Sequence, residues 1–290
     1  MRWLVVGGAG MLGQDVVARL RAADQDVSVS TQADLDITDA AACTSAVEGF
    51  DVVVNCAAWT AVDDAETQEG AAFGANAVGP ANLARAATAA GARLVQISTD
   101  YVFDGEATTP YAADAPIAPR SAYGRTKAAG EWAVRAEDPA GRHLVLRTAW
   151  LYGAGGGSFP RTIVKVARER GAVSVVTDQV GQPTWTGDVA DLVWRLVAAD
   201  VPGGTFHATS GGVASWFDFA QAAVGSAGLD PAIVGRTTSD AFVRPAPRPS
   251  YSVLGHDELE RVGVTPIGDW RERWAAACAS DGFAAAVLGA

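Results

Sequence analysis

Leu4-Val-Val-Gly7-Gly-Ala-Gly10-Met-Leu-Gly13 carries the strongest fold signal in this chain. A short apolar run leads straight into glycines, and a helix-like segment follows them. Glycines at such a turn let the backbone bend tightly and approach a pyrophosphate, which rests on the N-terminus of the helix. The spacing fits G-x-G-x-x-G counted from Gly8 and G-x-x-G-x-x-G counted from Gly7. Both readings predict a nucleotide-binding turn.

Beyond this turn, the first half of the chain alternates strand-like and helix-like segments. The strand-like segments are short and rich in valine, as strands buried on both faces should be. Predicted strands cover Leu4–Val6, Val27–Val29, Val52–Val54, Leu94–Ile97 and Leu144–Leu146. Predicted helices cover 11–23, 39–48, 80–90 and 122–137, with Asp39 as a candidate N-cap. The pattern predicts an α/β fold, a Rossmann-type doubly wound parallel sheet with a smaller C-terminal α/β substrate-binding part.

After residue 150 the rhythm of the sequence changes. Glycines crowd 153–157, and the segments that follow are predicted as helices at 159–170, 187–199, 215–227 and 269–280 and strands at 173–176 and 205–208. We predict an NAD(P)-binding Rossmann domain over 1–152, to which 184–210 also belongs. Residues 153–183 and 211–290 are predicted to form the substrate-binding domain. The chain should therefore cross between the two parts more than once.

Composition narrows the class of protein. The 290 residues carry a net charge of −11, which argues against nucleic-acid or membrane-surface partners because both need a basic footprint. No apolar run approaches the roughly 18–20 residues that span a bilayer. The three cysteines are odd in number and far apart, and the three histidines show no metal-ligand spacing. We expect a cytoplasmic protein, monomer or homodimer, that acts on a small molecule.

Tyr123 and Lys127 are the most informative pair of side chains. Four residues apart on a helix, they share one face, about 5–6 Å apart at Cβ. Tyrosine with its usual pKa near 10 is a poor catalyst at neutral pH, and a neighbouring cation should lower that pKa. The pair is therefore predicted to act as a general acid–base. An isolated pair of this kind would more often be a surface tyrosine beside a solvated lysine, but this pair does not stand alone.

Ser98-Thr99-Asp100 follows the predicted fourth strand, and open α/β sheets bind ligands beyond the carboxyl ends of their strands. The Thr99 hydroxyl can hold a substrate oxygen, although capping of the next turn is an equal alternative for the motif alone. Together with the Tyr/Lys pair it predicts a hydride-transfer site. Tyr123 would donate the proton, and Lys127 would bond the nicotinamide ribose.

Cofactor preference depends on the end of the second predicted strand. Ser30-Thr31-Gln32 places no acid there, so nothing repels a 2′-phosphate beside Thr31. Since no arginine demands the phosphate either, we predict tolerance of both NADPH and NADH. Asp34 is late enough to serve the approach to the next helix, and Asp36 and Ile37 could contact the adenine edge.

From the glycine turn to about residue 275, the chain resembles the dTDP-4-dehydrorhamnose reductase family of the extended short-chain dehydrogenase/reductases. The glycine turn and the Tyr/Lys pair occur across that superfamily, whereas the other shared stretches are more specific. These stretches are Val53-Val-Asn-Cys-Ala-Ala-Trp-Thr-Ala-Val-Asp63, Ser98-Thr-Asp-Tyr-Val-Phe-Asp-Gly105, Arg147-Thr-Ala-Trp-Leu-Tyr152, Asp178-Gln-Val-Gly-Gln-Pro-Thr184 and Arg248-Pro-Ser-Tyr-Ser-Val-Leu254.

The resemblance implies a role for individual residues. The implied catalytic set is Thr99, Tyr123 and Lys127. Implied cofactor contacts are Gly7, Gly10, Met11, Leu12 and Gly13 in the turn, and Ala57, Ala58 and Thr60 after the third strand. Implied substrate contacts, besides Thr99 and Tyr123, are Asp100, Tyr101, Trp150 and Arg248. Trp150 is equally compatible with a core position, because a tryptophan after a strand is often buried.

Some members of the family bind magnesium between subunits. Asp15 matches one glutamate of that site, but Gly187 stands at another, so we predict no metal. Arg125, Arg161 and Arg244 could meet a diphosphate or could be surface charges.

The favoured hypothesis is an NAD(P)H-dependent reductase of the C4 keto group of dTDP-4-dehydro-L-rhamnose. One alternative is a reductase of another nucleotide-linked 4-keto-6-deoxy sugar, as in natural-product pathways. A dehydratase of this fold would carry a glutamate after Asp100, where this chain has Tyr101. A non-catalytic regulatory subunit would not need the complete Thr/Tyr/Lys set.

Overall fold

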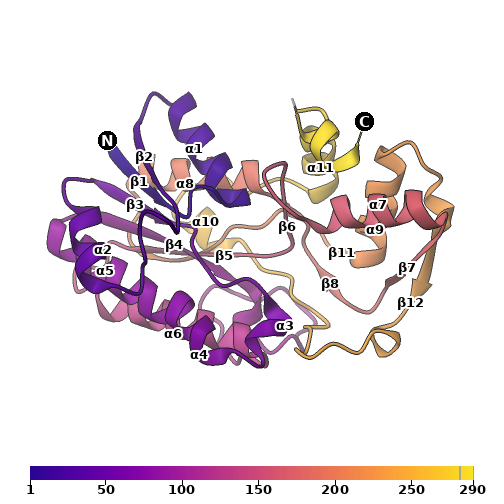
Figure 1. The fold of residues 1–290 in the computed structure, drawn as a ribbon, viewed down its shortest axis with the longest axis horizontal. Coiled ribbons are helices and arrows are strands. Elements are labelled where there is room, and N and C mark those ends of the chain that lie inside the picture. The colour runs from indigo at the N-terminus through magenta and orange to yellow at the C-terminus, as the bar shows by residue number, and fades with distance from the viewer. Residues whose placement is uncertain (281, 290) are drawn as a thin grey trace.

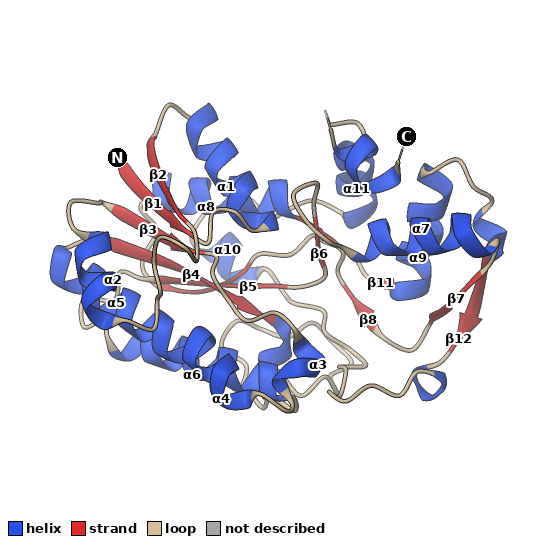
Figure 2. Ribbon diagram, viewed as in Figure 1, coloured by secondary structure: helices blue, strands red, loops and turns tan. Residues whose placement is uncertain are grey.

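A computed structural model describes residues 1–280 and 282–289. The chain forms a large lobe built on a parallel sheet and a smaller lobe of helices and short strands (Figures 1 and 2). The strands are β1 (Arg2–Val6), β2 (Asp26–Ser30), β3 (Val52–Asn55), β4 (Arg93–Thr99), β5 (Leu144–Thr148), β6 (Leu151–Tyr152), β7 (Val173–Val176), β8 (Val180–Gly181), β9 (Thr184–Trp185), β10 (Gly204–His207), β11 (Ala214–Ser215) and β12 (Val234–Thr237).

The helices are α1 (Met11–Ala22), α2 (Ala40–Val47), α3 (Val62–Ala65), α4 (Glu69–Phe73), α5 (Gly79–Ala90), α6 (Ala122–Ala136), α7 (Phe159–Arg170), α8 (Thr186–Ala198), α9 (Trp216–Ser226), α10 (Asp257–Arg261) and α11 (Trp270–Cys278). A π-helical turn, η1 (Gly74–Val78), joins α4 to α5, and η5 (Ala284–Leu288) is a second one; η2 (Asp100–Val102), η3 (Pro231–Ile233) and η4 (Ser239–Ala241) are 3₁₀ turns.

The large lobe is organised around a six-stranded sheet in the order β2-β1-β3-β4-β5-β10. Every neighbouring pair in it is parallel, and Val5 of β1 pairs with Val29 on one side and Val54 on the other. The chain steps from β1 to one side for β2 and then to the other side for β3. That reversal opens a crevice beyond the carboxyl ends of β1 and β3, where doubly wound folds bind their ligands. The predicted fold class is confirmed.

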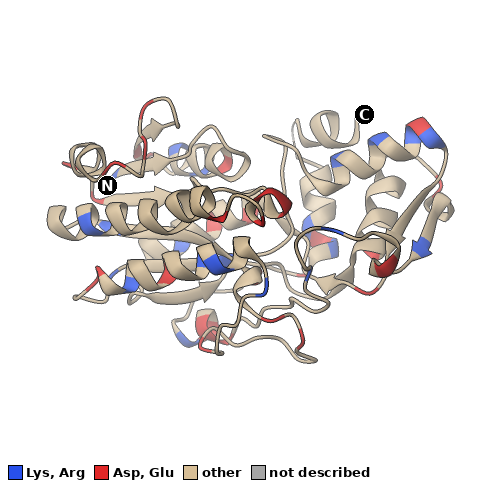
Figure 3. Ribbon diagram, turned by 60° about the horizontal axis from the view of Figure 1, so that its bottom comes forward, with Lys and Arg blue, Asp and Glu red and all other residues tan. Residues whose placement is uncertain are grey.

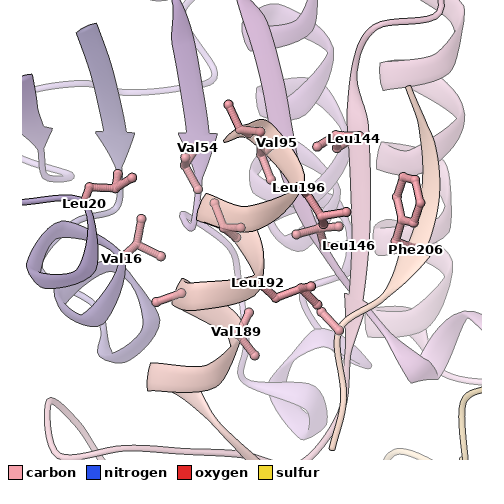
Figure 4. Close-up of a cluster of buried hydrophobic side chains, with 14 of the residues drawn as sticks. Val16, Leu20, Val54, Val95, Leu144, Leu146, Val189, Leu192, Leu196 and Phe206 are labelled. Atoms are coloured by element: carbon pink, nitrogen blue, oxygen red, sulfur yellow. The ribbon is translucent and has the colours of Figure 1, made fainter. Parts of the chain in front are cut away.

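Both faces of this sheet are covered by helices. Alternate residues of β1 point to opposite faces, so Val5 faces α1 and α8 while Leu4 faces α2 and α5. Figure 4 shows α8 at the centre of the first face, with Leu192 and Leu196 against Val95 and the leucines of β5. Since α8 and β10 come from beyond residue 185, the large lobe is completed by a late part of the chain.

The smaller lobe packs α7, α9 and α11 around aromatic side chains. Tyr152 and Phe219 pack against Trp274, with ring centroids 5.2 and 5.3 Å away. Two short strand pairs, β7–β12 and β8–β11, edge this lobe, and β6–β9 lies where the chain passes between lobes. These strands are two to four residues long, which is why the sequence signalled only β7 among them.

The elements that the sequence predicted are present, with ends shifted by one or two residues. Asp39 caps α2 as expected, because its carboxylate accepts hydrogen bonds from the backbone N–H groups of Ala41 and Ala42 at 2.8 and 3.1 Å. The predicted helix 80–90 was too short: it continues backwards through η1 to Glu69 in α4. Two glycines in 69–78 obscured that extension, since glycine lowers helix propensity.

Charge is spread over the molecule. In the view of Figure 3, acidic and basic residues are interspersed over both lobes. Within the described residues, none of the helices combines the length and apolar character needed to cross a bilayer.

Candidate active site

The glycine turn after β1 has the shape that a dinucleotide needs. Gly7 has φ of +75°, and a Cβ there would lie 2.6 Å from the backbone nitrogen of Ala57. A Cβ on Gly13 would lie 2.7 Å from Cα of Gly8. Gly10 is the N-cap of α1 and has no side chain to occupy the first-turn N–H groups. These features fit a pyrophosphate held against the helix N-terminus.

A second glycine-rich segment lies over this turn. The side-chain amide of Gln14 donates hydrogen bonds to the carbonyl oxygens of Ala9 and Gly155, at 2.8 and 3.0 Å. A Cβ on Gly156 would lie 3.1 Å from Cβ of Met11. The 153–157 loop is thus tied to the predicted cofactor turn.

The segment after β3 is held by Asn76, which sequence reasoning missed. The Asn76 side chain accepts from the N–H of Trp59 at 2.9 Å and donates to its carbonyl at 3.0 Å. It also donates to Thr126 Oγ1 at 3.0 Å. This buried amide, carried by the π-helical turn η1, fixes the backbone between Ala57 and Thr60. Single π-helical turns are frequent at functional sites, but this turn gives no signal in the sequence.

The end of β2 corrects one expectation. Asp34 folds back onto Thr31, and its carboxylate accepts from the Thr31 backbone N–H at 2.9 Å and from its hydroxyl at 2.6 Å. Those bonds lower the pKa of Asp34, so it carries a negative charge at neutral pH. The prediction that the end of β2 carries no acid was therefore wrong. The chain reverses within one turn after Thr31 and brings the Asp34 carboxylate back to the end of the strand.

Asp36 and Ile37 are occupied locally. The Asp36 carboxylate accepts from the backbone N–H and hydroxyl of Thr38 at 2.9 and 2.7 Å. Ile37 is buried, and the Asn82 side chain donates to its carbonyl at 3.0 Å. An adenine contact by either residue stays a prediction.

Helix α6 and strand β4 bring the predicted catalytic residues together. Lys127 is 3% exposed, and its Nζ donates to the carbonyl of Ile97 at 2.6 Å. The Thr99 hydroxyl donates to Asp100 Oδ1 at 2.9 Å and accepts from the Tyr101 N–H at 3.3 Å. The Thr99 hydroxyl also lies close enough to Tyr123 to lower the pKa of its phenol. Thr99 therefore caps the turn, as one reading of the motif predicted, and its contact with a substrate oxygen stays a prediction.

The protonation of the pair differs from what the spacing predicted. Burial raises the pKa of Tyr123 to about 12, and the nearby Thr99 hydroxyl offsets this only in part. Burial also lowers the pKa of Lys127 to about 8. The expectation that Lys127 lowers the tyrosine pKa was wrong for this arrangement, because the ammonium is directed to the carbonyl of Ile97.

Asp100 and Tyr101 extend the site towards the smaller lobe. Asp100 is 2% exposed, and loss of solvent around its carboxylate raises its pKa to about 6. Its Oδ2 is buried without a hydrogen bond of good geometry from the described residues. The Tyr101 ring packs edge-on against Tyr123, with centroids 5.5 Å apart and planes at 76°. The pair of rings forms an apolar wall beside a carboxylate.

A groove of about 300 Å³ continues from Tyr101 between the lobes. Its lining combines aromatic, apolar and cationic side chains: Tyr101, Phe159, Ile163, Ser174, Val175, Val176, Gln179, Trp216, Phe242, Arg244 and Arg248. Trp150, predicted as a pocket residue, stacks flat on Trp216 with centroids 3.6 Å apart. It does so with an unusual φ of +46° for a non-glycine residue. Trp150 thus packs against Trp216, which lines the groove, and is not itself among the lining residues.

Arg248 spans the two lobes. Its guanidinium donates to both carboxylate oxygens of Asp63, at 2.8 and 2.9 Å. Arg244 lies 3.4 Å from the same carboxylate. By contrast, Arg125 pairs with Glu69 on the surface, and Arg161 donates to the carbonyls of Gly156 and Ala286. Of the three arginines left open by the sequence, only Arg244 lines this groove.

The described residues show no cluster of three or more metal-ligating side chains. Asp15, the one match to a magnesium ligand, accepts a hydrogen bond from the hydroxyl of Thr186.

This arrangement can perform proton-coupled hydride transfer. The glycine turn, a neutral and partly buried phenol and a buried amine lie at the carboxyl ends of the strands, next to a groove with two arginines. Arginine suits diphosphate groups, and aromatic walls suit sugars and bases.

Comparison with known proteins agrees with this chemistry. Residues 1–281 match the family described as the RmlD substrate binding domain. A probable dTDP-4,6-dihydroxy-2-methyloxan-3-one 4-ketoreductase of Streptomyces antibioticus is 51% identical over 93% of this chain and 92% of that protein. The dTDP-4-dehydrorhamnose reductase of Streptomyces griseus is 47% identical over 93% of this chain and 90% of that protein.

Solved structures show the same relationship. The crystal structure of dTDP-4-dehydrorhamnose reductase from Bacillus anthracis, in complex with NADP, matches with a TM-score of 0.90 at 33% identity, over 95% of this chain and 97% of that chain. The resemblance read from the sequence is confirmed, and this chain belongs to the RmlD substrate binding domain family.

Proposed function

We propose that this protein is an NAD(P)H-dependent reductase that converts the C4 keto group of dTDP-4-dehydro-L-rhamnose into the hydroxyl of dTDP-L-rhamnose. The observation that carries the proposal is the meeting of Thr99, Tyr123 and Lys127 beside a groove that holds Arg248. The named activities of relatives at 47–51% identity support the reaction class.

The cofactor and the sugar nucleotide would bind to different parts of the molecule. The glycine turn, the segment 57–60 and the end of β2 would hold the dinucleotide on the large lobe. The nucleotide part of the sugar substrate would lie in the groove, with its diphosphate near Arg244 and Arg248 and its sugar near Tyr101 and Asp100. The Asp100 carboxylate, which has the Ser252 hydroxyl beside it, can accept a hydrogen bond from a sugar hydroxyl.

When bound, the reduced nicotinamide supplies the hydride that reduces C4. Tyr123 is neutral at physiological pH because its pKa is raised to about 12, so it carries the proton that the new alkoxide needs. Thr99, beside the phenol, would help to hold the substrate oxygen. Lys127 is mostly protonated at neutral pH, and its ammonium would bond the nicotinamide ribose. Thr99 and Lys127 are buried and Tyr123 is partly buried, which limits the access of competing water.

The test is oxidation of NADH and NADPH, followed by their absorbance, with dTDP-4-dehydro-L-rhamnose as substrate. Rapid oxidation with formation of dTDP-L-rhamnose would support the proposal. Absence of oxidation, while both cofactors still bind, would contradict it.

A second candidate is a 4-ketoreductase of a different dTDP-linked deoxysugar. It is favoured by the relative from Streptomyces antibioticus, whose name specifies another keto sugar and whose identity of 51% exceeds that of the Streptomyces griseus reductase. Parallel assays with the two keto sugars would separate the candidates by their kcat/KM ratio.

A further inference from the structure

One face of α6 carries a buried acid in line with the proposed catalytic pair. Tyr123, Lys127 and Glu131 follow one another at intervals of four residues and so lie in one row along the helix. Glu131 is 1% exposed, and the catalytic role proposed above does not use it. It is the member of the row that sequence reasoning overlooked, because a glutamate in an amphipathic helix usually faces solvent.

This row docks on consecutive residues of β4. Lys127 Nζ donates to the carbonyl of Ile97 at 2.6 Å. The hydroxyl of Ser98, the next residue, donates to Glu131 Oε1 at 2.6 Å. Thr99 follows and meets Tyr123. The carboxylate thus fixes the register in which the helix presents its lysine and tyrosine to the strand.

Glu131 is held by a buried ion pair across the sheet. Arg147 of β5 donates from Nε to Oε1 at 2.9 Å and from Nη2 to Oε2 at 2.8 Å. The two side chains are 0% and 2% exposed. Arg135, on the surface of the helix, donates a third arginine hydrogen bond to the carboxylate, from Nη2 to Oε2 at 2.9 Å. Burying such a pair is costly, so its presence points to a requirement other than stability.

The group that Glu131 serves lies one turn earlier on the same face of α6: its carboxylate raises the pKa of Lys127, which burial otherwise lowers. Besides Glu131, the titratable group facing the ammonium is Cys56 at the end of β3, whose thiol is neutral because burial raises its pKa to about 12. Tyr123 on the same helix is neutral as well. Arg147 and Arg135 face Glu131, and His207 of β10 lies 3.5 Å from Arg147, with its pKa lowered by burial to about 3. Of the groups described here around Lys127 and Glu131, the carboxylate of Glu131 is thus the one that carries a negative charge at neutral pH.

We propose that Glu131 is a positioning residue that keeps Lys127 protonated and docked on β4 at neutral pH. Without the carboxylate, the buried ammonium would face the uncompensated charge of Arg147 and would lose its proton more readily. The consequence for turnover rests on the proposed function, whereas the effect on Lys127 does not.

The composition of the chain makes a direct test simple. Lys127 and Lys165 are its two lysines, so protein labelled with [¹³Cε]lysine should give two lysine signals whose shifts report protonation. In Glu131→Gln, we expect Lys127 to titrate at least about one pH unit lower than in the wild type. Glu169→Gln is the matched control, because Glu169 lies four residues after the exposed Lys165, 3.9 Å from its Nζ. It should leave Lys127 unchanged.

A second variant covers the case in which Glu131→Gln fails to fold. Arg135→Gln removes a cation from Glu131 at a half-exposed position, so Lys127 should titrate at a higher pH than in the wild type. Unchanged titration of Lys127 in Glu131→Gln, or unchanged or lower titration in Arg135→Gln, would overturn the proposal.

The affinity for NADH and NADPH, measured against pH in the same variants, separates the two proposals. If the alkaline fall of the affinity and of kcat/KM moves to lower pH together with the lysine signal, the positioning role extends to function. If the lysine signal moves and the affinity does not, Glu131 tunes Lys127 as inferred, but the cofactor role proposed for Lys127 is wrong.

Discussion

At the scale of single residues, the proposed proton donor Tyr123 is a weak acid that keeps its proton. Its pKa of about 12 leaves it protonated throughout the physiological range, and it can still protonate the more basic alkoxide that forms when a carbonyl is reduced. The Tyr101 ring packs edge-on against it and limits its movement, so little reorganisation is needed when charge develops on the substrate oxygen.

Tyr123→Phe should keep cofactor affinity and lower kcat by roughly 10²–10⁴-fold, since the ring stays and the proton donor is lost. The measurements are kcat and the Kd for NADH and NADPH. Tyr152→Phe is the matched control: Tyr152 is also buried, and its hydroxyl has no partner among the described residues. Near-normal turnover in the Tyr123→Phe variant would remove Tyr123 from the mechanism.

Asp34 should govern the choice of cofactor. Its carboxylate lies on Thr31, at the strand end where a 2′-phosphate would sit. We expect NADH to bind more tightly than NADPH, and Asp34→Asn to shift the ratio of their Kd values towards NADPH by about tenfold, or about 1.4 kcal/mol. Asp26→Asn, at the opposite end of β2, removes the same charge and should leave the ratio unchanged. An unchanged ratio in Asp34→Asn would place the 2′-phosphate elsewhere.

The pH dependence of turnover should report Lys127. Its pKa of about 8 is lowered by burial, so the ammonium form is present below that pH and lost above it. We expect log kcat/KM to be level near neutral pH and to fall as pH rises through about 8. A profile that stays level well above this value would show that the charge of Lys127 is not required.

At the scale of elements, the N-terminus of α1 depends on the absence of a side chain. Gly13→Ala would drive a methyl against the backbone of Gly8 and Gly7, and overpacking of this kind costs roughly 1–3 kcal/mol. We expect the Kd for both cofactors to rise by about tenfold or more. Gly70→Ala adds the same methyl to α4 where nothing lies within 4 Å, so it should leave both Kd values unchanged. Equal effects of the two variants would contradict the proposed cofactor turn.

The elements of the large lobe could be predicted because valine-rich strands and one glycine turn are local signals. The positions of Thr99, Tyr123 and Lys127 followed for the same reason: two strand-and-helix motifs fix them. The return of Asp34 onto Thr31, the π turn that carries Asn76 and the ion pair of Glu131 depend on contacts between distant or reversed segments. The hydrophobic periodicity of a sequence does not report such contacts. The pKa of Tyr123 depends on its burial, which the four-residue spacing from Lys127 does not reveal.

At the scale of the whole molecule, the lobes are joined over the groove by Asp63, Arg248 and Arg244. The carboxylate is 26% exposed and its strongest partner 20% exposed, so solvent weakens the ion pair and its contribution is about 0.5–1 kcal/mol. Asp63 also accepts from the backbone N–H of Ala246 at 3.2 Å. The contacts of Asp63 with Arg244, Ala246 and Arg248 therefore order the segment that carries both arginines.

Asp63→Asn should lower thermal stability slightly and raise KM for the sugar nucleotide, with the cofactor Kd unchanged. The hydrogen bonds and charge of Arg248 hold the pKa of Asp63 below its usual value of 3.8. The stability difference between wild type and variant should therefore be complete above 3.8 and vanish as pH falls below it. Melting curves across this range provide the measurement, and a difference that persists in acid would rule out the ion pair as its source.

The late arrival of β10 in the sheet has a consequence for how the protein is made. On the ribosome, the first five strands emerge in order, but β5 keeps an open edge until residues 204–207 appear. The face of the sheet that α1 covers in part stays incompletely covered until α8 has been synthesised, and Ile267 belongs to the same cluster. Nascent chains shorter than about 210 residues would expose that surface to chaperones. Synthesis of the smaller lobe's first segments thus delays completion of the nucleotide-binding lobe.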